Sequence, residues 1–345
     1  MTNVSPELTP PGASQPEHLR IFFGADGLRA AWSLLIAVAL FLLLSPAVSS
    51  LLRSTGLLPS RLAQHSPGPF FIFANETVPF LITVLITWIM ARLEGRPISV
   101  YGLGGHRKLA NLVFGVLTGL IAISLLVFIL LKAGLLIVDR SLLSGSQAVL
   151  YAILWIPAFL AIAFFEEYLF RGYLQYTLAR GLSGLAQHLS FSRNPRALGF
   201  WTAAVLVSFG FAAVHRSNPG ESPLGLLCAG AASLIFCFSL WRTGSLWWAI
   251  GLHAAWDYGQ SFLFGVGDSG IFVSPRLLET HPAGSPLLSG GATGPEGSIF
   301  SLVVLAVVAI VIHRAQPLGP HSYLSQMPAP HLPPDPAAAS SEATT

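Results

Sequence analysis

Charged residues are scarce in this sequence, and that scarcity excludes an ordinary soluble enzyme. Asp, Glu, Lys and Arg make up 10% of the 345 residues, whereas hydrophobic residues make up 53%. A soluble domain carries about 25% charged residues. The composition therefore predicts a protein that crosses a membrane several times. The same apolar content excludes intrinsic disorder for the body of the chain.

Cysteine is nearly absent, and the basic residues form no cluster. The two cysteines, Cys228 and Cys237, lie nine positions apart in one apolar segment. That spacing is about 13 Å along a helix, which is too far for a disulfide. The eighteen basic residues are spread along the chain and leave a net charge of +3. We therefore expect no disulfide framework, no cysteine-based metal site and no nucleic-acid partner.

Long apolar segments dominate what is present. A helix that crosses the hydrocarbon core needs about 20 apolar residues. Segments near this length cover residues 29–52, 70–92, 110–137, 147–174, 198–216, 224–243, 244–265 and 298–315. The polar letters WRTGS at 241–245 indicate a turn between the sixth and seventh segments. The sequence predicts an all-α polytopic membrane protein, a bundle of about eight transmembrane helices within residues 29–315.

Three stretches outside the apolar segments are polar. The N-terminal segment, residues 1–28, lacks the basic region followed directly by an apolar core that marks a cleaved signal peptide. Residues 266–297 are rich in Gly, Ser and Pro, and we expect them to form an extramembrane loop, either a lid or a mobile connection. The tail, residues 316–345, is rich in Pro, Ala and Ser, a composition typical of disorder.

The positions of the basic residues predict the orientation of the helices. With the N-terminus inside, eleven Lys and Arg side chains fall on the cytoplasmic side and six on the other, leaving Arg171 aside. Cytoplasmic loops carry an excess of Lys and Arg. We therefore expect both termini in the cytoplasm. The polar N-terminus and proline-rich tail are typical of a bacterial protein, so the expected location is a bacterial inner membrane.

A few ionisable side chains lie deep inside the apolar segments. A charge at the bilayer centre costs about 2.5–3.5 kcal/mol on insertion scales, so such residues face a protein interior or a cavity and usually serve a function. The deep set consists of Glu166, Glu167, Arg171, His215, His253 and Asp257. Carboxylates and imidazoles are the residue types used in metal-assisted or general-base hydrolysis.

The spacing in the fourth segment separates two carboxylates. Glu167 and Arg171 are four residues apart, hence on one helix face and able to form an ion pair. Glu166 points about 100° away from Glu167 around the helix. The two carboxylates can therefore take different roles.

Two further pairs have the same spacing of four. Phe211 and His215 share one helix face, and His253 and Asp257 share another. The second pair is either two metal ligands or a histidine oriented by a carboxylate. Taken alone, each pair also has a structural explanation: Phe211 as packing, His215 at the membrane edge, and His253 with Asp257 as a polar tie between helices. The three groups together predict one shared site.

In a bundle of straight helices, Glu166 and His215 would lie at different depths in the membrane. With the N-terminus inside, Glu166 lies in the inner half of its helix and His215 near the outer end of the next. Straight helices would place the two side chains at different depths. A tilt of about 20°, which is normal for transmembrane helices, would bring them closer.

The three groups occur in order in successive apolar segments and resemble a known family. FFEEYLFRG contains the motif E-E-x-x-x-R, FAAVH contains F-x-x-x-H, and HAAWD contains H-x-x-x-N/D. This set is similar to the CPBP family of intramembrane proteases, which includes type II CAAX prenyl endopeptidases and bacteriocin-processing or immunity (Abi) proteins. The resemblance covers residues 147–260, about a third of the chain, and the count of eight helices agrees with it.

The resemblance implies catalytic roles for four residues. Glu166 would be the general base that activates the attacking water. His215 would hold that water or act as a metal ligand. His253 and Asp257 would stabilise the oxyanion or complete a metal site with His215 and Glu166. The family is described as metal-dependent, so Zn²⁺ is expected, and a metal-free glutamate mechanism stays open.

The resemblance also implies supporting roles and a substrate class. Glu167 and Arg171 would form the supporting pair, and Phe211 would line the cavity. The expected reaction is hydrolysis of a peptide bond in a membrane-associated protein or peptide, since no feature of the sequence indicates recognition of a prenyl group.

Two alternatives to an active peptidase stay open. A catalytically silent scaffold or immunity protein of the same family would keep the motifs without turnover. A membrane proton relay or transporter also uses buried Glu, His and Asp, although such proteins often carry inverted repeats, and we find no internal repeat here.

Overall fold

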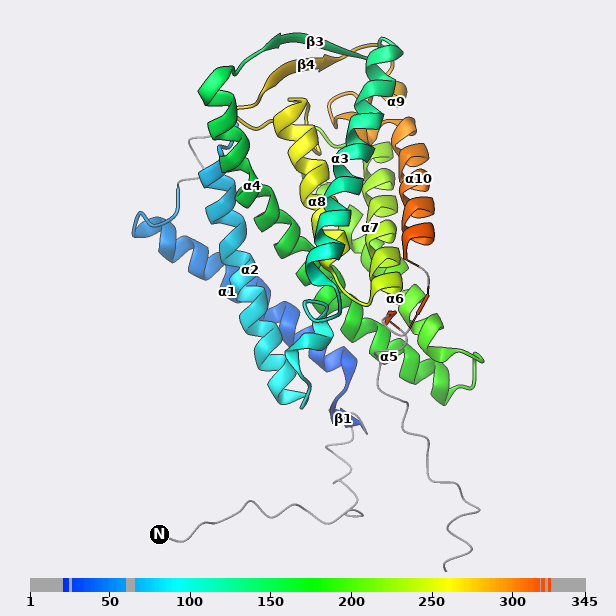
Figure 1. Cartoon of the computed structure of the whole chain (residues 1–345). Coiled ribbons are helices and arrows are strands. Elements are labelled where there is room, and N and C mark those ends of the chain that lie inside the picture. Colours follow the sequence, from blue (N-terminus) through cyan, green and yellow to red (C-terminus); the bar gives the residue numbers. More distant parts are fainter. Residues whose placement is uncertain (1–20, 25–26, 60–65, 317, 320–321, 324–345) are drawn as a thin grey trace, which may run out of the picture.

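The apolar segments form a bundle of helices (Figure 1). The structure is a computed structural model that describes residues 21–24, 27–59, 66–316, 318–319 and 322–323. Most of the predicted disordered tail and most of the polar N-terminal segment lie outside the described residues. Within that tail, Tyr323 is described and its side chain is buried. The predicted orientation, with both termini inside, stays a prediction.

Six helices of the described chain are long and apolar enough to cross a membrane. They are α1 (Ala30–Ser54), α2 (Pro69–Leu93), α3 (Lys108–Lys132), the continuous run Gly145–His188, α6 (Pro195–His215) and α7 (Pro223–Thr243). Two shorter helices, α8 (Trp247–Asp257) and the apolar α10 (Ile299–Ala315), correspond to the seventh and eighth predicted segments. The predicted polytopic helical bundle is confirmed.

The outer surface of the bundle is apolar, as a bilayer requires. Ile121 on α3 is 66% exposed and Phe209 on α6 is 76% exposed, and many other large apolar side chains on these helices are exposed too. Soluble monomers rarely expose continuous apolar surface of this extent, because it is unfavourable in water. These faces therefore contact lipid, and polar side chains are gathered inside.

Two of the three helices that carry motif residues change their winding directly after a motif carboxylate. The run Gly145–His188 consists of α4 (Gly145–Glu167), the π-helical η4 (Tyr168–Leu174) and α5 (Gln175–His188). In the same way, α8 continues as the π-helical η5 (Tyr258–Leu263). π-helical turns are rare and frequently lie at functional sites. The hydrophobic pattern did not predict them.

The third apolar segment ends earlier than predicted. We expected a helix to residue 137, but α3 ends at Lys132, and the next element is β3 (Leu136–Ser141). Gly134 adopts a φ of 68°, which ends the helix. β3 pairs antiparallel with β4 (Leu278–Pro282), and the two strands lie across one end of the bundle (Figure 1). The smaller elements are β1 (Phe23–Gly24), β2 (Gly27–Leu28), η3 (Ile98–Tyr101), α9 (Pro286–Ser289) and η6 (Pro295–Gly297).

The predicted extramembrane loop, residues 266–297, is tied to the bundle by hydrogen bonds. The indole Nε1 of Trp155 on α4 donates to the carbonyl oxygen of Pro275 at 2.8 Å. The amide of Gln260 on η5 donates to the carbonyl oxygen of Gly267 at 2.9 Å. These bonds hold the loop, which includes β4, against the end of the bundle that β3 also covers. Its role as a lid stays a prediction.

Glycines bring α3 and α8 into close contact. A Cβ atom added to Gly115, Gly119 or Gly251 would lie within 2.4 Å of a backbone oxygen of the opposing helix. Small residues spaced by four let two membrane helices approach closely and pack by van der Waals contact. Because α8 carries His253 and Asp257, this contact fixes the position of both side chains in the bundle.

Adding a methyl group at this contact should destabilise the fold. We expect Gly115→Ala and Gly119→Ala each to cost about 1–3 kcal/mol, because the opposing backbone must move away. Thermal unfolding of the purified protein in detergent measures the change. Gly210→Ala on α6 is the matched control, since nothing lies within 4 Å of its added Cβ. Equal Tm values for all three variants would contradict the close packing of α3 on α8.

Candidate active site

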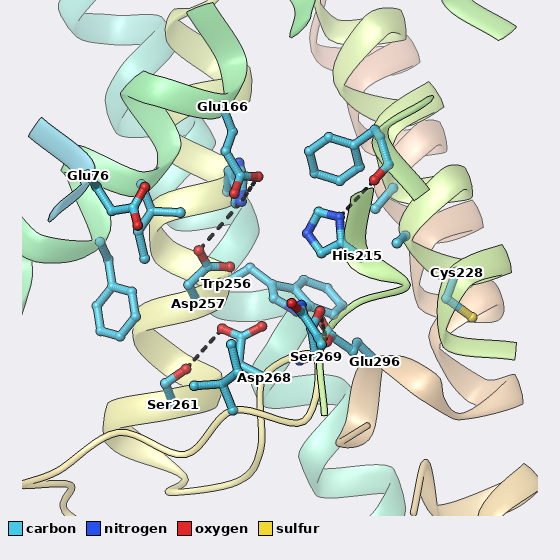
Figure 2. Close-up of a pocket in the computed structure, with 18 of the residues that line it drawn as sticks. Glu76, Glu166, His215, Cys228, Trp256, Asp257, Ser261, Asp268, Ser269 and Glu296 are labelled. Carbon is cyan, nitrogen blue, oxygen red and sulfur yellow. Dashed lines mark hydrogen bonds and ion pairs between the residues drawn. The ribbon is translucent and has the colours of Figure 1, made fainter. Parts of the chain in front are cut away.

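A cavity of about 440 Å³ opens between the helices and the loop that covers one end of the bundle. It is lined from α2, α4, α6, α7, α8 and α10, and by residues of the segment 266–297. Five of the seven residues predicted for the site line this cavity: Glu166, Phe211, His215, His253 and Asp257. Figure 2 shows the side chains of Glu166, His215 and Asp257 around a common space. Residues that are far apart in the sequence therefore meet at one site.

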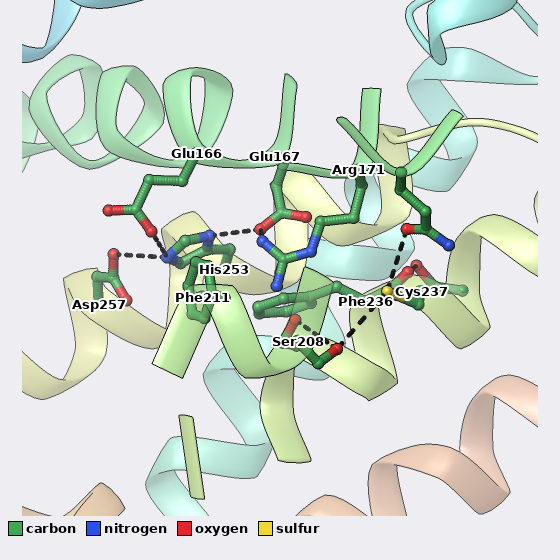
Figure 3. Close-up of polar contacts among 12 residues, drawn as sticks. Glu166, Glu167, Arg171, Ser208, Phe211, Phe236, Cys237, His253 and Asp257 are labelled. Atoms are coloured by element: carbon green, nitrogen blue, oxygen red, sulfur yellow. Dashed lines mark hydrogen bonds and ion pairs between the residues drawn. The ribbon is translucent and has the colours of Figure 1, made fainter. Parts of the chain in front are cut away.

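The other two predicted residues, Glu167 and Arg171, lie behind the cavity wall. Their predicted ion pair is present, with Arg171 Nη1 3.0 Å from Glu167 Oε1 and neither side chain exposed. The same Glu167 oxygen is 2.9 Å from Nδ1 of His253 (Figure 3). Two of the three motifs are thus joined at one carboxylate oxygen. Glu167 is the carboxylate bonded to Nδ1 of His253. The sequence had allowed this orienting role for Asp257 and not for Glu167.

His253 presents its second nitrogen to two carboxylates. Its Nε2 lies 3.8 Å from Glu166 Oε2 and 3.5 Å from Asp257 Oδ2. An ionised carboxylate only accepts hydrogen bonds, so Nδ1 of His253 donates to Glu167. In the neutral ring, Nε2 then carries the lone pair and can accept a proton or hold a water at the cavity wall. In the imidazolium form the same atom is a donor.

His215 faces the same cavity from the C-terminal end of α6, without joining this cluster. Its Nδ1 donates to the carbonyl oxygen of Phe211 at 2.7 Å, and the two rings lie 4.6 Å apart. The expected difference in depth between Glu166 and His215 does not separate them, because both line one cavity. The oblique course of α4 in Figure 1 is consistent with this arrangement.

The segment 266–297 adds acidic residues that sequence reasoning missed. Asp268 and Glu296 line the cavity (Figure 2). Asp268 accepts a hydrogen bond from Ser261 at 2.9 Å, and Glu296 accepts one from the Ser269 hydroxyl at 3.0 Å. Carboxylates in a polar loop carry no sign of burial in the sequence. Only the folding of the loop against the helices places them at the site.

Burial changes the acidity of these loop carboxyls. Burial raises the pKa of Asp268 from 3.8 to about 6, and the hydrogen bond from Ser261 opposes this shift. Burial also raises the pKa of Glu296, and the nearby charge of Asp268 raises it further. In both cases the protein interior disfavours the charged form. The loop therefore contributes groups that hold a proton at higher pH than exposed carboxyls do.

The predicted metal ligands do not form a ligand set in this structure. Among the described residues, no group of three or more His, Cys, Asp or Glu side chains is arranged to hold a metal ion. Nδ1 of His253 and Nδ1 of His215 are engaged by Glu167 and by the backbone of Phe211, so Nε2 of each ring would be the atom that binds a metal. The expected Zn²⁺ stays a prediction, and so does the metal-free glutamate mechanism.

The motif region matches a known family. Residues 147–259 match the family model for type II CAAX prenyl endopeptidase Rce1-like proteins. The match spans all three motifs and agrees with the expected region, 147–260. No curated protein and no solved structure matches the chain. The chain carries an Rce1-like type II CAAX prenyl endopeptidase domain in a polytopic membrane bundle, and this family implies a peptidase.

Removing Arg171 should destabilise the fold strongly. We expect Arg171→Ala to cost about 3–5 kcal/mol, because the carboxylate of Glu167 is then left buried without its counter-charge. Unfolding of the purified protein in detergent measures the loss. Arg140→Ala is the control, since Arg140 pairs with Glu279 at the surface and is 70% exposed. This variant should lose less than about 1 kcal/mol. A similar loss in both variants would argue against a buried charge network.

Asp268 should make stability depend on pH. Its raised pKa means that its contribution is fully present below the ordinary value of 3.8 and is lost as the pH rises through about 6. We therefore expect the Tm of the wild type minus that of Asp268→Asn to fall across this range. Thermal unfolding of both proteins at a series of pH values measures the difference. A constant difference would show that Asp268 is not buried.

Proposed function

We propose that this protein is an intramembrane endopeptidase that hydrolyses a peptide bond of a membrane-associated protein or peptide. The observation that carries the proposal is the convergence of Glu166, His253 and Asp257 at one cavity wall, inside an apolar bundle that carries the Rce1-like domain. A bilayer-spanning bundle places a carboxylate next to an oriented imidazole only where such groups serve a function.

Glu166 is the proposed general base. Its side chain is 21% exposed and reaches into the cavity, whereas the adjacent Glu167 is fully buried and engaged by Arg171. Glu166 takes a proton from a water in the cavity, and the water oxygen bonds to the carbonyl carbon of the substrate. The proton is then transferred to the leaving nitrogen as the carbon–nitrogen bond breaks. The products are a carboxylate and an amine.

His253 and Asp257 stabilise the tetrahedral intermediate in this proposal. The Nε2 atom of His253 lies between the two carboxylates and donates to the oxyanion when it carries a proton. Asp257 can donate to an oxyanion only in its protonated form, because an ionised carboxylate is an acceptor. Glu167 accepts a hydrogen bond from Nδ1 and so holds one edge of the imidazole, while Nε2 is left for the cavity.

His215 is proposed to hold the water or the substrate rather than to act on Glu166 directly. The bond from Nδ1 to the Phe211 backbone fixes the ring and leaves Nε2 free for the cavity. A neutral imidazole with a free Nε2 accepts a hydrogen bond from water. Elemental analysis of the purified protein, before and after treatment with a chelator, tests whether Zn²⁺ takes part as well.

The base assignment predicts a selective loss of turnover. Glu166→Gln keeps the size of the side chain but cannot take a proton, so we expect kcat to fall by at least about 10²-fold. The assay follows cleavage of a peptide library in liposomes, with farnesylated and unmodified C-a-a-X peptides included. Glu76→Gln is the matched control, because Glu76 lines the same cavity from α2. Its kcat should stay close to that of the wild type.

The alternatives give different results in the same liposomes. A silent scaffold or immunity protein would cleave no peptide in wild-type or variant form. A proton relay would carry a flux that Glu166→Gln reduces, without any cleavage. Cleavage by the wild type with unchanged turnover in Glu166→Gln would remove Glu166 from the mechanism and leave the peptidase assignment in place.

A further inference from the structure

An aromatic residue outside the three motifs contacts the centre of the buried network. Phe236 lies on α7, a helix that carries none of the motif residues, and its side chain is 5% exposed. It also lines the cavity. The function proposed above assigns no role to this residue.

Phe236 contacts two members of the network at once. Its ring stacks on the imidazole of His253, with the ring centroids 5.1 Å apart and the planes 18° from parallel. The guanidinium carbon of Arg171 lies 5.0 Å from the Phe236 centroid and 4.2 Å from that of Phe211. Figure 3 shows Phe236 beside Arg171 and close to His253. The arginine charge is therefore bordered by two aromatic faces, which attract cations.

The stacking supplies a constraint that the hydrogen bond alone does not. A single bond from Nδ1 of His253 to Glu167 fixes one edge of the imidazole, yet the ring can still turn about that bond. A flat aromatic ring packed nearly parallel to the imidazole limits this rotation. With the plane fixed, Nε2 stays between Glu166 and Asp257. An aliphatic side chain of similar volume would fill the space without fixing the plane.

We propose that Phe236 is a positioning residue for the hydrolysis reaction. Its ring holds the plane of the His253 imidazole. It also contacts Arg171, the ion-pair partner of Glu167. This inference rests on the proposed peptidase function, because it assigns Phe236 a role in that reaction. Phe236 itself does not touch the reacting atoms in this account. It acts through His253.

Replacement of the ring separates positioning from packing. Phe236→Leu and Phe236→Met keep an apolar side chain but remove the flat face. We expect kcat to fall at least about tenfold, because small misplacements of catalytic groups reduce rates strongly. KM should stay near the wild-type value. Phe236→Tyr keeps the ring and should restore most of kcat. Either aliphatic variant suffices if the other is poorly folded.

A second aromatic residue of α7 provides the matched control. The guanidinium carbon of Arg242 packs over the ring of Phe238, 5.8 Å from its centroid. Phe238 is not among the residues that line the cavity. Phe238→Leu removes a comparable aromatic contact on the same helix and should leave kcat close to that of the wild type. An equal loss of kcat in Phe238→Leu and Phe236→Leu would overturn the proposal, since the effect would then be one of helix packing.

The orientation of His253 is also measured without turnover. The Nδ1 proton of His253, in its hydrogen bond to Glu167, is followed by NMR of nitrogen-15-labelled protein in detergent. We expect slow exchange of this proton with solvent in the wild type and in Phe236→Tyr, and clearly faster exchange in Phe236→Leu, because a ring that can turn breaks this bond more often. Equal exchange rates in Phe236→Leu and the wild type, with unchanged kcat, would overturn the proposal. If the wild type cleaves no peptide, the proposed function fails, and the exchange rates still decide whether Phe236 orients His253.

Discussion

The burial of Glu167 and Arg171 is the constraint on which the rest of the site depends. Neither side chain has any exposed surface, and an unpaired charge at such a place costs several kcal/mol. Glu167 is compensated by Arg171 one turn further along and by Nδ1 of His253 on α8. The two contacts to Oε1 of Glu167 therefore tie α4, η4 and α8 together at one point. The glycine contact between α3 and α8 holds α8 in place.

This constraint also divides two adjacent carboxylates between structure and chemistry. Glu167 faces the protein interior and is held there, whereas Glu166 faces a cavity that is partly open. The imidazole of His253 lies between them and connects the fixed carboxylate with the proposed base. Its position is limited at one edge by Glu167 and on one face by Phe236. A rigid wall of this kind suits a reaction in which water must be held and deprotonated inside an apolar bundle.

Much of this arrangement could be predicted from the sequence, because burial of charge leaves a clear signal. Apolar length predicted the helices, and Glu166, Glu167, His253 and Asp257 stood out as ionisable groups in apolar surroundings. Asp268 and Glu296 left no such signal, since they lie in a polar loop. The end of α3 was predicted too late, because Leu136 and Ile137 suit a strand as well as a helix. Phe236 is one of 23 phenylalanines in an apolar chain, and only the packing of α7 distinguishes it.

The central claim is that a water molecule held at this wall is added across a peptide bond. The most direct measurement is mass spectrometry of the products formed in water enriched in the heavy oxygen isotope. We expect the new C-terminal carboxylate to contain one oxygen atom from the solvent, and we expect the wild type to form this product while Glu166→Gln does not. Cleavage without incorporation of solvent oxygen, or equal incorporation by both proteins, would contradict it.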